Sequence, residues 1–323
     1  MSTKRSTKRR YRLRNWRDYN TALVRRGSLT FWVDAATLAS WTRGGRTGRR
    51  GRPCVYSDGA IRMLLTLKAV YHLTLRSTEG LAGSLVALLR VTLPVPDFST
   101  LSRRERTLAV PLPVRCVTAP LHWVIDSTGL KIFGEGEWKV RQHGWTRHRR
   151  WLRLHLAVDT ETGALRSLGA STNSVTDGEM LPAMLAAEQA PLRQVTGDGA
   201  YDQWSCWDAV AARPERPRAV FPPPRTYRRV RRPRIKQHGN SALPPLERDT
   251  AIRRIRAVGR AAWKREVGYH QRSLAETAVW RWRSFFGDHV HARTTDRQFT
   301  EIFICGAAFN RMTALGMPDS YPV

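Results

Sequence analysis

The sequence predicts an α/β protein in which a mainly helical region precedes a mixed sheet with helices packed on it. Residues 58–107 have the apolar spacing of helices. From about residue 121 the order becomes strand, hairpin, helix, strand, helix and strand. We therefore expect a basic arm at 1–20, a mainly helical region at 21–117 and a sheet-containing domain at 118–323.

The composition indicates a polyanionic partner. The chain has 323 residues, of which 41% are hydrophobic, and a formal net charge of +29. So large an excess of one sign repels itself, and nucleic acid is the first candidate to neutralise it. We expect no membrane span, because no apolar run reaches about 20 residues. The basic N-terminus lacks the apolar core of a signal peptide, so we expect a cytoplasmic protein.

The four cysteines are scattered and form no C-x-x-C pair. A zinc ribbon and a disulfide framework are therefore both disfavoured.

The first 20 residues carry a run of cations with no acid before Asp18. We expect a flexible arm that contacts phosphates; the alternative is a solvated tail. Its cations are Lys4, Arg5, Lys8, Arg9, Arg10, Arg12, Arg14 and Arg17.

Three helices are expected within residues 58–107. The first spans 59–75, the second follows a cap at Ser77 or Thr78, and the third begins near Ser99. A basic third helix resembles a helix-turn-helix, whose last helix enters the major groove of DNA. A small helical subdomain without that role is the alternative. The third helix should expose Arg103, Arg104 and Arg106.

The sheet region alternates strand and helix signals. A turn at 159–163 and a helix cap at Thr176 or Asp177, with Glu179 in the first turn, mark two of the boundaries. The expected elements are a strand at 121–133, a hairpin at 151–171, a helix at 176–189, a strand at 193–201, a helix at 203–212 and a strand at 218–224.

Residues 222–265 interrupt this pattern with a Pro- and Arg-rich stretch followed by a basic helix at 252–266. We interpret them as an insertion before the closing helix; the alternative is a disordered linker. A segment of this charge must be covered by solvent or by a polyanion.

Two aspartates stand at apolar strands although acids are scarce. Asp126 interrupts VIDSTG, where a carboxylate requires a partner. Asp198 lies between glycines in GDGAYD, at the end of another apolar strand. The structural alternatives are a strand-end turn through Ser127 and Thr128 for Asp126, and a simple glycine turn for Asp198.

Glu276 is the lone acid in YHQRSLAETAVWRWRSFFG, residues 269–287, which we expect to form one amphipathic helix. Steps of three and four place it on one face with cations and aromatic residues, apart from a second stripe that suits the core. The alternative is an exposed ion pair between Arg272 and Glu276. The first face holds Tyr269, Arg272, Glu276, Trp280 and Arg283, and the second holds Leu274, Ala278, Trp282 and Phe285.

Three carboxylates on two strands and a late helix can converge on hard divalent cations. Mg²⁺ prefers oxygen ligands and bridges carboxylates to phosphates. Two such ions activate an attacking oxygen and stabilise the leaving one in phosphodiester chemistry. We expect two Mg²⁺ ions, for which Mn²⁺ can substitute, and arginines that bind phosphates.

The other acids have simpler explanations. Asp159 and Glu161 lie in a turn, Asp177 and Glu179 lie at a helix start, and Asp202 follows Asp198 as a supporting group.

These motifs resemble those of the DDE transposases of bacterial insertion sequences, specifically the insertion sequence 5 family. YHQRSLAETAVWRWR matches that family's Y-(2)-R-(3)-E-(6)-K pattern as Tyr269, Arg272, Glu276 and Arg283. Arginine replaces the final lysine, which keeps the charge and changes the donor geometry. VIDSTGLKIFGEGEWK and VTGDGAYD resemble the segments around the first two acids, and RNWRDYNTALVRRGSLTFW resembles the N-terminal region.

The resemblance implies an RNase H-like core from about residue 118, preceded by a helical DNA-binding region. It implies that Asp126, Asp198 and Glu276 are catalytic and bind the metal. It also implies that Tyr269, Arg272 and Arg283 contact DNA near the scissile bond.

The activity implied is that of a nucleoid-associated transposase. Water nicks the element at its terminal inverted repeats, and the freed 3′-OH attacks target double-stranded DNA. Assembly on two element ends implies a homodimer in the synaptic complex.

Two alternatives remain. One is a metal-dependent nuclease with the same core and no strand transfer. The other is a basic DNA-binding protein without catalysis, such as a regulator or a decayed transposase. The presence of all three acids argues against decay.

Overall fold

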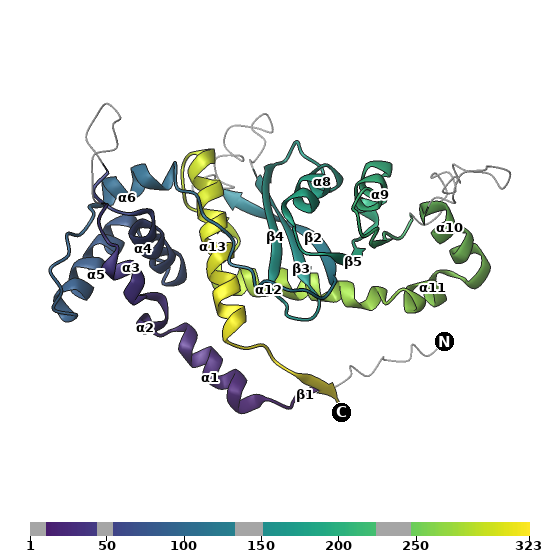
Figure 1. The fold of residues 1–323 in the computed structure, drawn as a ribbon, viewed down its shortest axis with the longest axis horizontal. Helices are drawn as coiled ribbons and strands as arrows, with labels where there is room; N and C mark the ends of the chain where they lie inside the picture. The colour runs from purple at the N-terminus through teal and green to yellow at the C-terminus, as the bar shows by residue number, and fades with distance from the viewer. Residues whose placement is uncertain (1–10, 44–53, 133–150, 224–246) are drawn as a thin grey trace, which may run out of the picture.

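The computed structural model describes residues 11–43, 54–132, 151–223 and 247–323, which form a six-stranded mixed sheet and its surrounding helices (Figure 1). The strand order is β4-β3-β2-β5-β6, and β7 pairs with the far end of β2. β3 is antiparallel to β2 and β4, whereas β5 is parallel to β2 and β6. The strands are β2 (Leu121–Ile132), β3 (Trp151–Asp159), β4 (Leu165–Thr172), β5 (Leu192–Thr196), β6 (Arg218–Val220) and β7 (His289–Val290).

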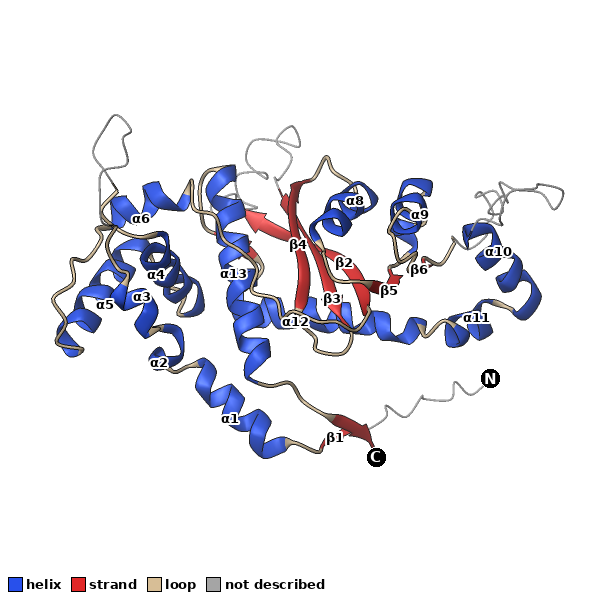
Figure 2. Cartoon of the chain, viewed as in Figure 1, coloured by secondary structure: helices blue, strands red, loops and turns tan. Residues whose placement is uncertain are grey.

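Helices cover both faces of this sheet (Figure 2). Strand side chains alternate between faces, so Trp123 and Ile125 pack with α8 (Asp177–Ala187) and α9 (Trp204–Ala211). Val124 and Leu156 belong instead to the cluster of α12 (Ser273–Phe286) and α13 (Thr295–Leu315). The predicted class, a mixed sheet with flanking helices, is confirmed.

The expected elements of the sheet region are present, but two strands are shorter than predicted: the strand predicted at 193–201 ends at Thr196, and the strand predicted at 218–224 ends at Val220. The hairpin turns at Gly163, whose φ of +67° favours glycine. Thr176 and Glu179 form a capping box at the start of α8. Residues 133–150, which include the last residue of the strand predicted at 121–133, lie outside the described residues.

The three helices expected within residues 58–107 are present with shifted boundaries. The second begins earlier than predicted, because the Thr74 hydroxyl, not Ser77 or Thr78, accepts the capping hydrogen bond, from the Ser77 backbone N–H. The third is capped by Asp97. The helices before the sheet are α1 (Trp16–Arg26), α2 (Leu29–Trp32), α3 (Ala35–Ala39), α4 (Asp58–Val70), α5 (Leu75–Leu88) and α6 (Phe98–Glu105).

The exposure predicted for the third helix is correct at Arg103 and Arg106 and wrong at Arg104; α6 itself ends at Glu105. The Arg104 side chain is 13% exposed, pairs with Asp58 and donates to the Tyr56 carbonyl oxygen at 2.8 Å. It therefore holds α6 against α4. The helix-turn-helix arrangement stays a prediction.

One apolar core joins the helical region to the sheet. It runs from Trp32 and Leu64 to Leu130 and Phe309. The long helix α13, which the sequence reasoning did not predict, packs against both α4 and β4. The division at 117 stays a prediction, and the two parts share their packing.

The insertion and the N-terminal arm differ from expectation. The predicted basic helix is two helices, α10 (Glu247–Val258) and α11 (Arg260–Glu266), separated at Gly259, whose φ is +82°. Residues 224–246 of the insertion and 1–10 of the arm lie outside the described residues.

The flexible arm is not found at residues 11–20. Part of this stretch forms β1 (Tyr11–Leu13), antiparallel to β8 (Ser320–Pro322), and part of it belongs to α1. Among the helices described here, none is both long and apolar enough to cross a membrane.

Two histidines are buried in the sheet. His155 is fully buried and bonds the Ser171 hydroxyl at 2.8 Å. Burial is the main cause that lowers the pKa of His155 from 6.5 to about 4. The charge of Asp177 raises this pKa, and the charge of Arg153 lowers it. Burial is also the main cause that lowers the pKa of His122 in β2 to about 4.

We predict that the free energy of unfolding falls as pH decreases from about 6.5 to 4. In this range the two histidines are protonated in the unfolded chain and stay neutral in the folded protein. Each histidine contributes roughly 3 kcal/mol over this window. Urea unfolding at several pH values measures the effect. His155→Gln should flatten the profile, and the exposed control His270→Gln should leave it unchanged. An equally steep profile in His155→Gln would contradict the prediction.

Candidate active site

Asp126 and Asp198 are brought to the same level by the parallel pairing of β2 and β5. The last register pair is Val124 with Thr196, and each aspartate lies two residues beyond its member of that pair. Asp198 follows the end of β5, whereas Asp126 lies within β2, which continues to Ile132. The alternative of a strand-end turn at Asp126 is therefore wrong.

Asp126 is half-buried on the face of the sheet that packs against α12. It accepts a hydrogen bond from the Ser127 backbone N–H at 2.9 Å. Burial raises the pKa of the Asp126 carboxyl; Arg272 opposes this effect, and the nearby charges of Asp198 and Glu276 add to it. Asp198 and Glu276 are therefore close enough to Asp126 for their charges to affect it. We name Asp126, Asp198 and Glu276 the carboxylate cluster.

The loop that carries Asp198 depends on close packing at Gly197. A Cβ atom there would lie 2.7 Å from Cδ2 of Tyr201 and 3.0 Å from Cγ1 of Ile125. The loop turns into a 3-10 segment, η1 (Gly199–Tyr201), and the Asp198 carboxylate accepts from the Ala200 backbone N–H at 2.9 Å. Here glycine serves a close approach, because its φ is not positive.

Glu276 lies in the first turn of α12, and its side chain is 57% exposed. The predicted core stripe is correct at Ala278 and Trp282 and shifted by one residue at its ends. Ala275 and Phe286 are buried, whereas Leu274 and Phe285 are half-buried.

The prediction of one α-helix over 269–287 is wrong at its start. Tyr269 and Arg272 belong to a 3-10 segment, η2 (Tyr269–Arg272), and α12 begins at Ser273. This segment contacts β2 directly.

The Arg272 guanidinium joins two members of the carboxylate cluster. Its Nη2 lies 3.3 Å from Oδ2 of Asp126, and its Nη1 bonds Oε1 of Glu276. Burial opposes its charge, but Asp126, Tyr269 and Glu276 raise its pKa overall. The ion pair proposed as the structural alternative is present, and it extends to Asp126.

The other two predicted DNA-contacting residues flank this arrangement. Tyr269 is half-buried; burial raises the pKa of its phenol, as do the charges of the carboxylate cluster, against the opposing charge of Arg272. Arg283 is exposed and donates from Nη2 to the Thr128 hydroxyl at 2.6 Å. Thr128, which sequence reasoning treated only as a turn residue, shares the strand face of Asp126 because it lies two residues further along.

Three of the remaining acids are used structurally. Asp159 is buried and accepts from the Thr162 hydroxyl at 2.6 Å. Asp177 pairs with Arg153 at 3.0 Å. Asp202 is bound by both Nε and Nη2 of Arg248, each at 2.8 Å.

The chemistry of the carboxylate cluster fits a hard cation, because three acids supply only oxygen ligands and their mutual repulsion favours a positive charge. Across the ranges described above, no three His, Cys, Asp or Glu side chains are arranged so that they hold an ion directly. Arg272 provides the positive charge between Asp126 and Glu276 in this arrangement.

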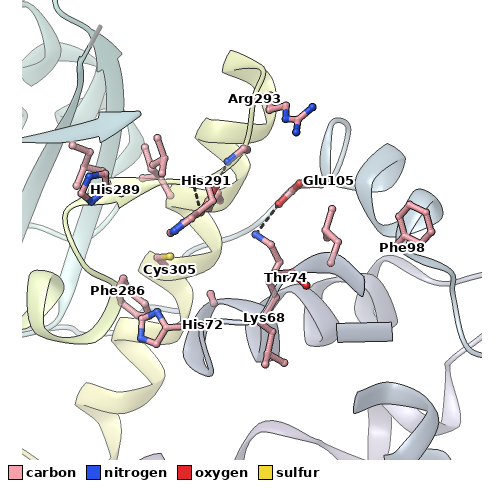
Figure 3. Close-up of a pocket in the computed structure, with 18 of the residues that line it drawn as sticks. Lys68, His72, Thr74, Phe98, Glu105, Phe286, His289, His291, Arg293 and Cys305 are labelled. Atoms are coloured by element: carbon pink, nitrogen blue, oxygen red, sulfur yellow. Dashed lines mark hydrogen bonds and ion pairs between the residues drawn. The ribbon is translucent and has the colours of Figure 1, made fainter. Parts of the chain in front are cut away.

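A separate pocket of about 560 Å³ lies between α4, α5 and α6 on one side and α12, β7 and α13 on the other (Figure 3). In it, Lys68 Nζ lies 3.7 Å from Oε1 of Glu105, and Glu301 accepts the Ala292 backbone N–H at 2.8 Å. No member of the carboxylate cluster lines this pocket. It belongs to the junction between the helical region and the sheet.

Two protein-family models match the chain, and both are described as Transposase DDE domain. One matches residues 24–135 and the other matches residues 118–311. The second match includes all three acids of the carboxylate cluster. The mixed sheet with flanking helices fits the RNase H-like fold expected of such a domain.

We predict that Gly197→Ala destabilises the protein by about 1–3 kcal/mol, because the added methyl group overpacks against Tyr201 and Ile125. It should also displace Asp198. The matched control is Gly199→Ala, whose Cβ would come no closer than 3.4 Å to the Pro222 carbonyl oxygen. Thermal unfolding of both variants tests this; equal stability of the two would show that the close approach at Gly197 is unimportant.

Proposed function

The chain belongs to the DDE transposase family, whose members act on DNA by phosphoryl transfer, and we propose that it cuts and joins the ends of an insertion sequence of the insertion sequence 5 family. In this proposal it binds terminal inverted repeats, nicks the element end with water and transfers the freed 3′-OH to target DNA.

The observation that carries this proposal is the carboxylate cluster itself. Asp126 in β2 and Asp198 just beyond β5 are each two residues past the same register pair, and Glu276 lies close enough to raise the pKa of Asp126. Exposed Arg283 and half-buried Arg272 accompany them. Acids for a cation beside arginines for phosphates form the combination that phosphodiester chemistry needs.

Asp126, Asp198 and Glu276 would hold two divalent cations, Mg²⁺ or Mn²⁺. When bound, these ions would supply electrostatic stabilisation to the attacking and leaving oxygens. Asp126 is buried and lies near the charges of Asp198 and Glu276. Both effects make its carboxylate bind a positive charge more strongly.

Tyr269, Arg272 and Arg283 would hold the DNA strand around the scissile phosphate. A guanidinium has five donors, so the bond from Arg283 to Thr128 leaves capacity for a phosphate. When cations bind, they would neutralise Asp126 and Glu276 in place of Arg272. Arg272 would then exchange its two carboxylate partners for a phosphate. The arginine at 283, in the place of the family's lysine, allows bidentate binding of phosphate.

The helical region would bind the terminal repeats. Arg103 in α6 and Arg106 directly after it are exposed, and Arg106 also pairs with Asp296 at 3.6 Å. Two element ends require two active sites, which supports a homodimer in the synaptic complex. Double-stranded DNA as the substrate supports a cytoplasmic, nucleoid-associated enzyme.

We predict that Glu276→Gln abolishes metal-dependent cleavage of element-end DNA, with a loss of at least about 100-fold, while DNA binding is retained. The amide keeps the shape of the side chain and removes a charged oxygen ligand. The control is Glu161→Gln, an exposed acid in the β3–β4 turn whose pair with Arg193 is 3.4 Å long. Cleavage by Glu276→Gln at the wild-type rate would remove Glu276 from the site.

Pre-cut element ends separate the proposal from its alternatives. A transposase joins the free 3′-OH to target DNA, a nuclease without strand transfer does not, and a non-catalytic binding protein neither cuts nor joins. Gel analysis of joined products with Mg²⁺ distinguishes the three.

We also predict that Arg272→Ala strengthens Mn²⁺ binding in the absence of DNA by about tenfold, because the guanidinium no longer competes for Asp126 and Glu276. Calorimetric titration measures this without any catalytic step. The matched control is Arg283→Ala, which loses a contact to Thr128 and, within the described ranges, none to an acid. Weaker or unchanged Mn²⁺ binding in Arg272→Ala would mean that the arginine and the ion do not compete.

A further inference from the structure

The face of the sheet that carries Asp126 also carries a buried polar row. Strand side chains alternate between faces, so His122, four residues earlier in β2, shares that face. The register pairs His122 with Gln194 of β5, and Thr196 follows Gln194 by two residues on the same face. His122 and Thr196 are buried, and Gln194 is half-buried. Polar side chains therefore link β2 to β5 just before the two strands reach their acids.

The side-chain amide of Gln194 ties this row to backbone outside the sheet. Its Nε2 lies 3.1 Å from Nε2 of His122 and 3.0 Å from the Thr196 hydroxyl, and it donates to the Val267 carbonyl oxygen at 3.1 Å. A carbonyl oxygen only accepts, so this bond identifies the nitrogen end of the amide. A neutral His122 suits the same arrangement, because its Nε2 can then accept a hydrogen bond.

Val267 stands at the corner where α11 gives way to η2. The last carbonyl groups of a helix have no partner within that helix, and Val267 is the C-cap of α11. Gly268 follows with a φ of +66°, and its N–H bonds the Arg265 carbonyl oxygen at 3.2 Å. Tyr269 then begins η2. Gln194 therefore supplies a donor to a helix-end carbonyl at this corner.

The position of the corner affects the position of Arg272. η2 has four residues, contacts β2 directly and leads into α12, which is fixed in the core by Ala275 and Trp282. A 3-10 segment rises only about 2 Å per residue, so so short a link has little slack. Arg272 at its end must reach two acids at once. η2 is thus held at one end by the core of α12 and at the other by Gln194.

We infer that Gln194 is a positioning residue, whose bond to the Val267 carbonyl oxygen fixes the corner from which η2 holds Arg272 at the carboxylate cluster. The inference rests on the proposed function, and it adds a residue to which the sequence analysis assigned no role. Gln194 acts through the backbone of η2 and through Arg272. A glutamine that merely stabilised the sheet would have no specific link to Arg272.

The test uses Gln194→Met, which keeps the approximate shape of the side chain and removes its donor. The matched control is Gln298→Met. Gln298 is buried in α13 and donates from Nε2 to the Ala292 carbonyl oxygen at 3.0 Å, so its loss removes the same kind of bond at another place.

The first measurement is hydrogen exchange of the backbone amides of Gly268 and Gln271, in the full chain without metal or DNA. The Gln271 N–H bonds the Gly268 carbonyl oxygen at 3.1 Å, so its exchange reports whether η2 is formed. We expect exchange at both amides to be about tenfold faster in Gln194→Met, because the corner loses a hydrogen bond. Gln298→Met should leave their exchange unchanged.

The second measurement isolates the link to Arg272 by calorimetric titration with Mn²⁺. A looser η2 weakens the hold of Arg272 on its two acids, so Gln194→Met should bind Mn²⁺ about threefold more tightly than the wild type. Added to Arg272→Ala, the same substitution should have no further effect, because the residue through which it acts is gone. Gln298→Met should bind Mn²⁺ as the wild type does.

The inference is wrong if exchange at Gly268 and Gln271 keeps its wild-type rate in Gln194→Met, or if Gln298→Met accelerates it equally. It is also wrong if Gln194→Met changes the Mn²⁺ affinity by the same factor with and without Arg272, since the glutamine would then act on the acids through β5.

Failure of the proposed function is distinguishable from these outcomes. It is measured by cleavage of element-end DNA in Glu276→Gln, whereas exchange requires neither metal nor DNA. Absence of Mn²⁺ binding in every variant would contradict the proposed function, and exchange would still decide whether Gln194 holds η2.

Discussion

The parallel pairing of β2 with β5 determines where the acids lie. Its register puts Asp126 and Asp198 two residues beyond the pair of Val124 and Thr196. The antiparallel pairing of β2 with β3 adds the second constraint, because Asp126 stands opposite Leu156 and so faces α12 rather than α8. A shift of β2 by one residue would turn Asp126 into the opposite core. Glu276 then needs only a helix anchored on that same face.

Electrostatic balance in the carboxylate cluster depends on Arg272. Three acids that repel one another are costly in a half-buried site, and burial and repulsion together raise the pKa of Asp126. A guanidinium fork reaches two carboxylates at once, as a compact ammonium cannot. The Nε of Arg272 is buried without a partner in the described residues. A buried donor without a partner is a local cost of holding this guanidinium between two acids.

The sequence was sufficient for elements whose signals are local. An apolar run predicted β2, and alternation predicted the hairpin. A cap at Thr176 or Asp177 predicted the start of α8, and isolated acids in apolar strands pointed to Asp126 and Asp198. Helix α13 was missed because its buried face contains polar residues that find partners far away. Asn310, for example, bonds the carbonyl oxygens of Leu165 at 2.7 Å and Pro113 at 2.9 Å. Local periodicity cannot reveal such satisfaction, nor the change from 3-10 to α-helix at Ser273.

Helix α12 divides its work between two sides, and this division explains its composition. Ala275, Ala278 and Trp282 fix it to a core that continues into the helical region. Glu276, Trp280 and Arg283 lie on the other side, where Arg283 reaches Thr128 of β2 and Trp280 is exposed to solvent. Because one packed core joins α4, α13 and α12, DNA held by the helical region would meet α12 at a fixed distance. The position of the cut relative to the bound repeat would then follow from packing, without any further recognition at the carboxylate cluster.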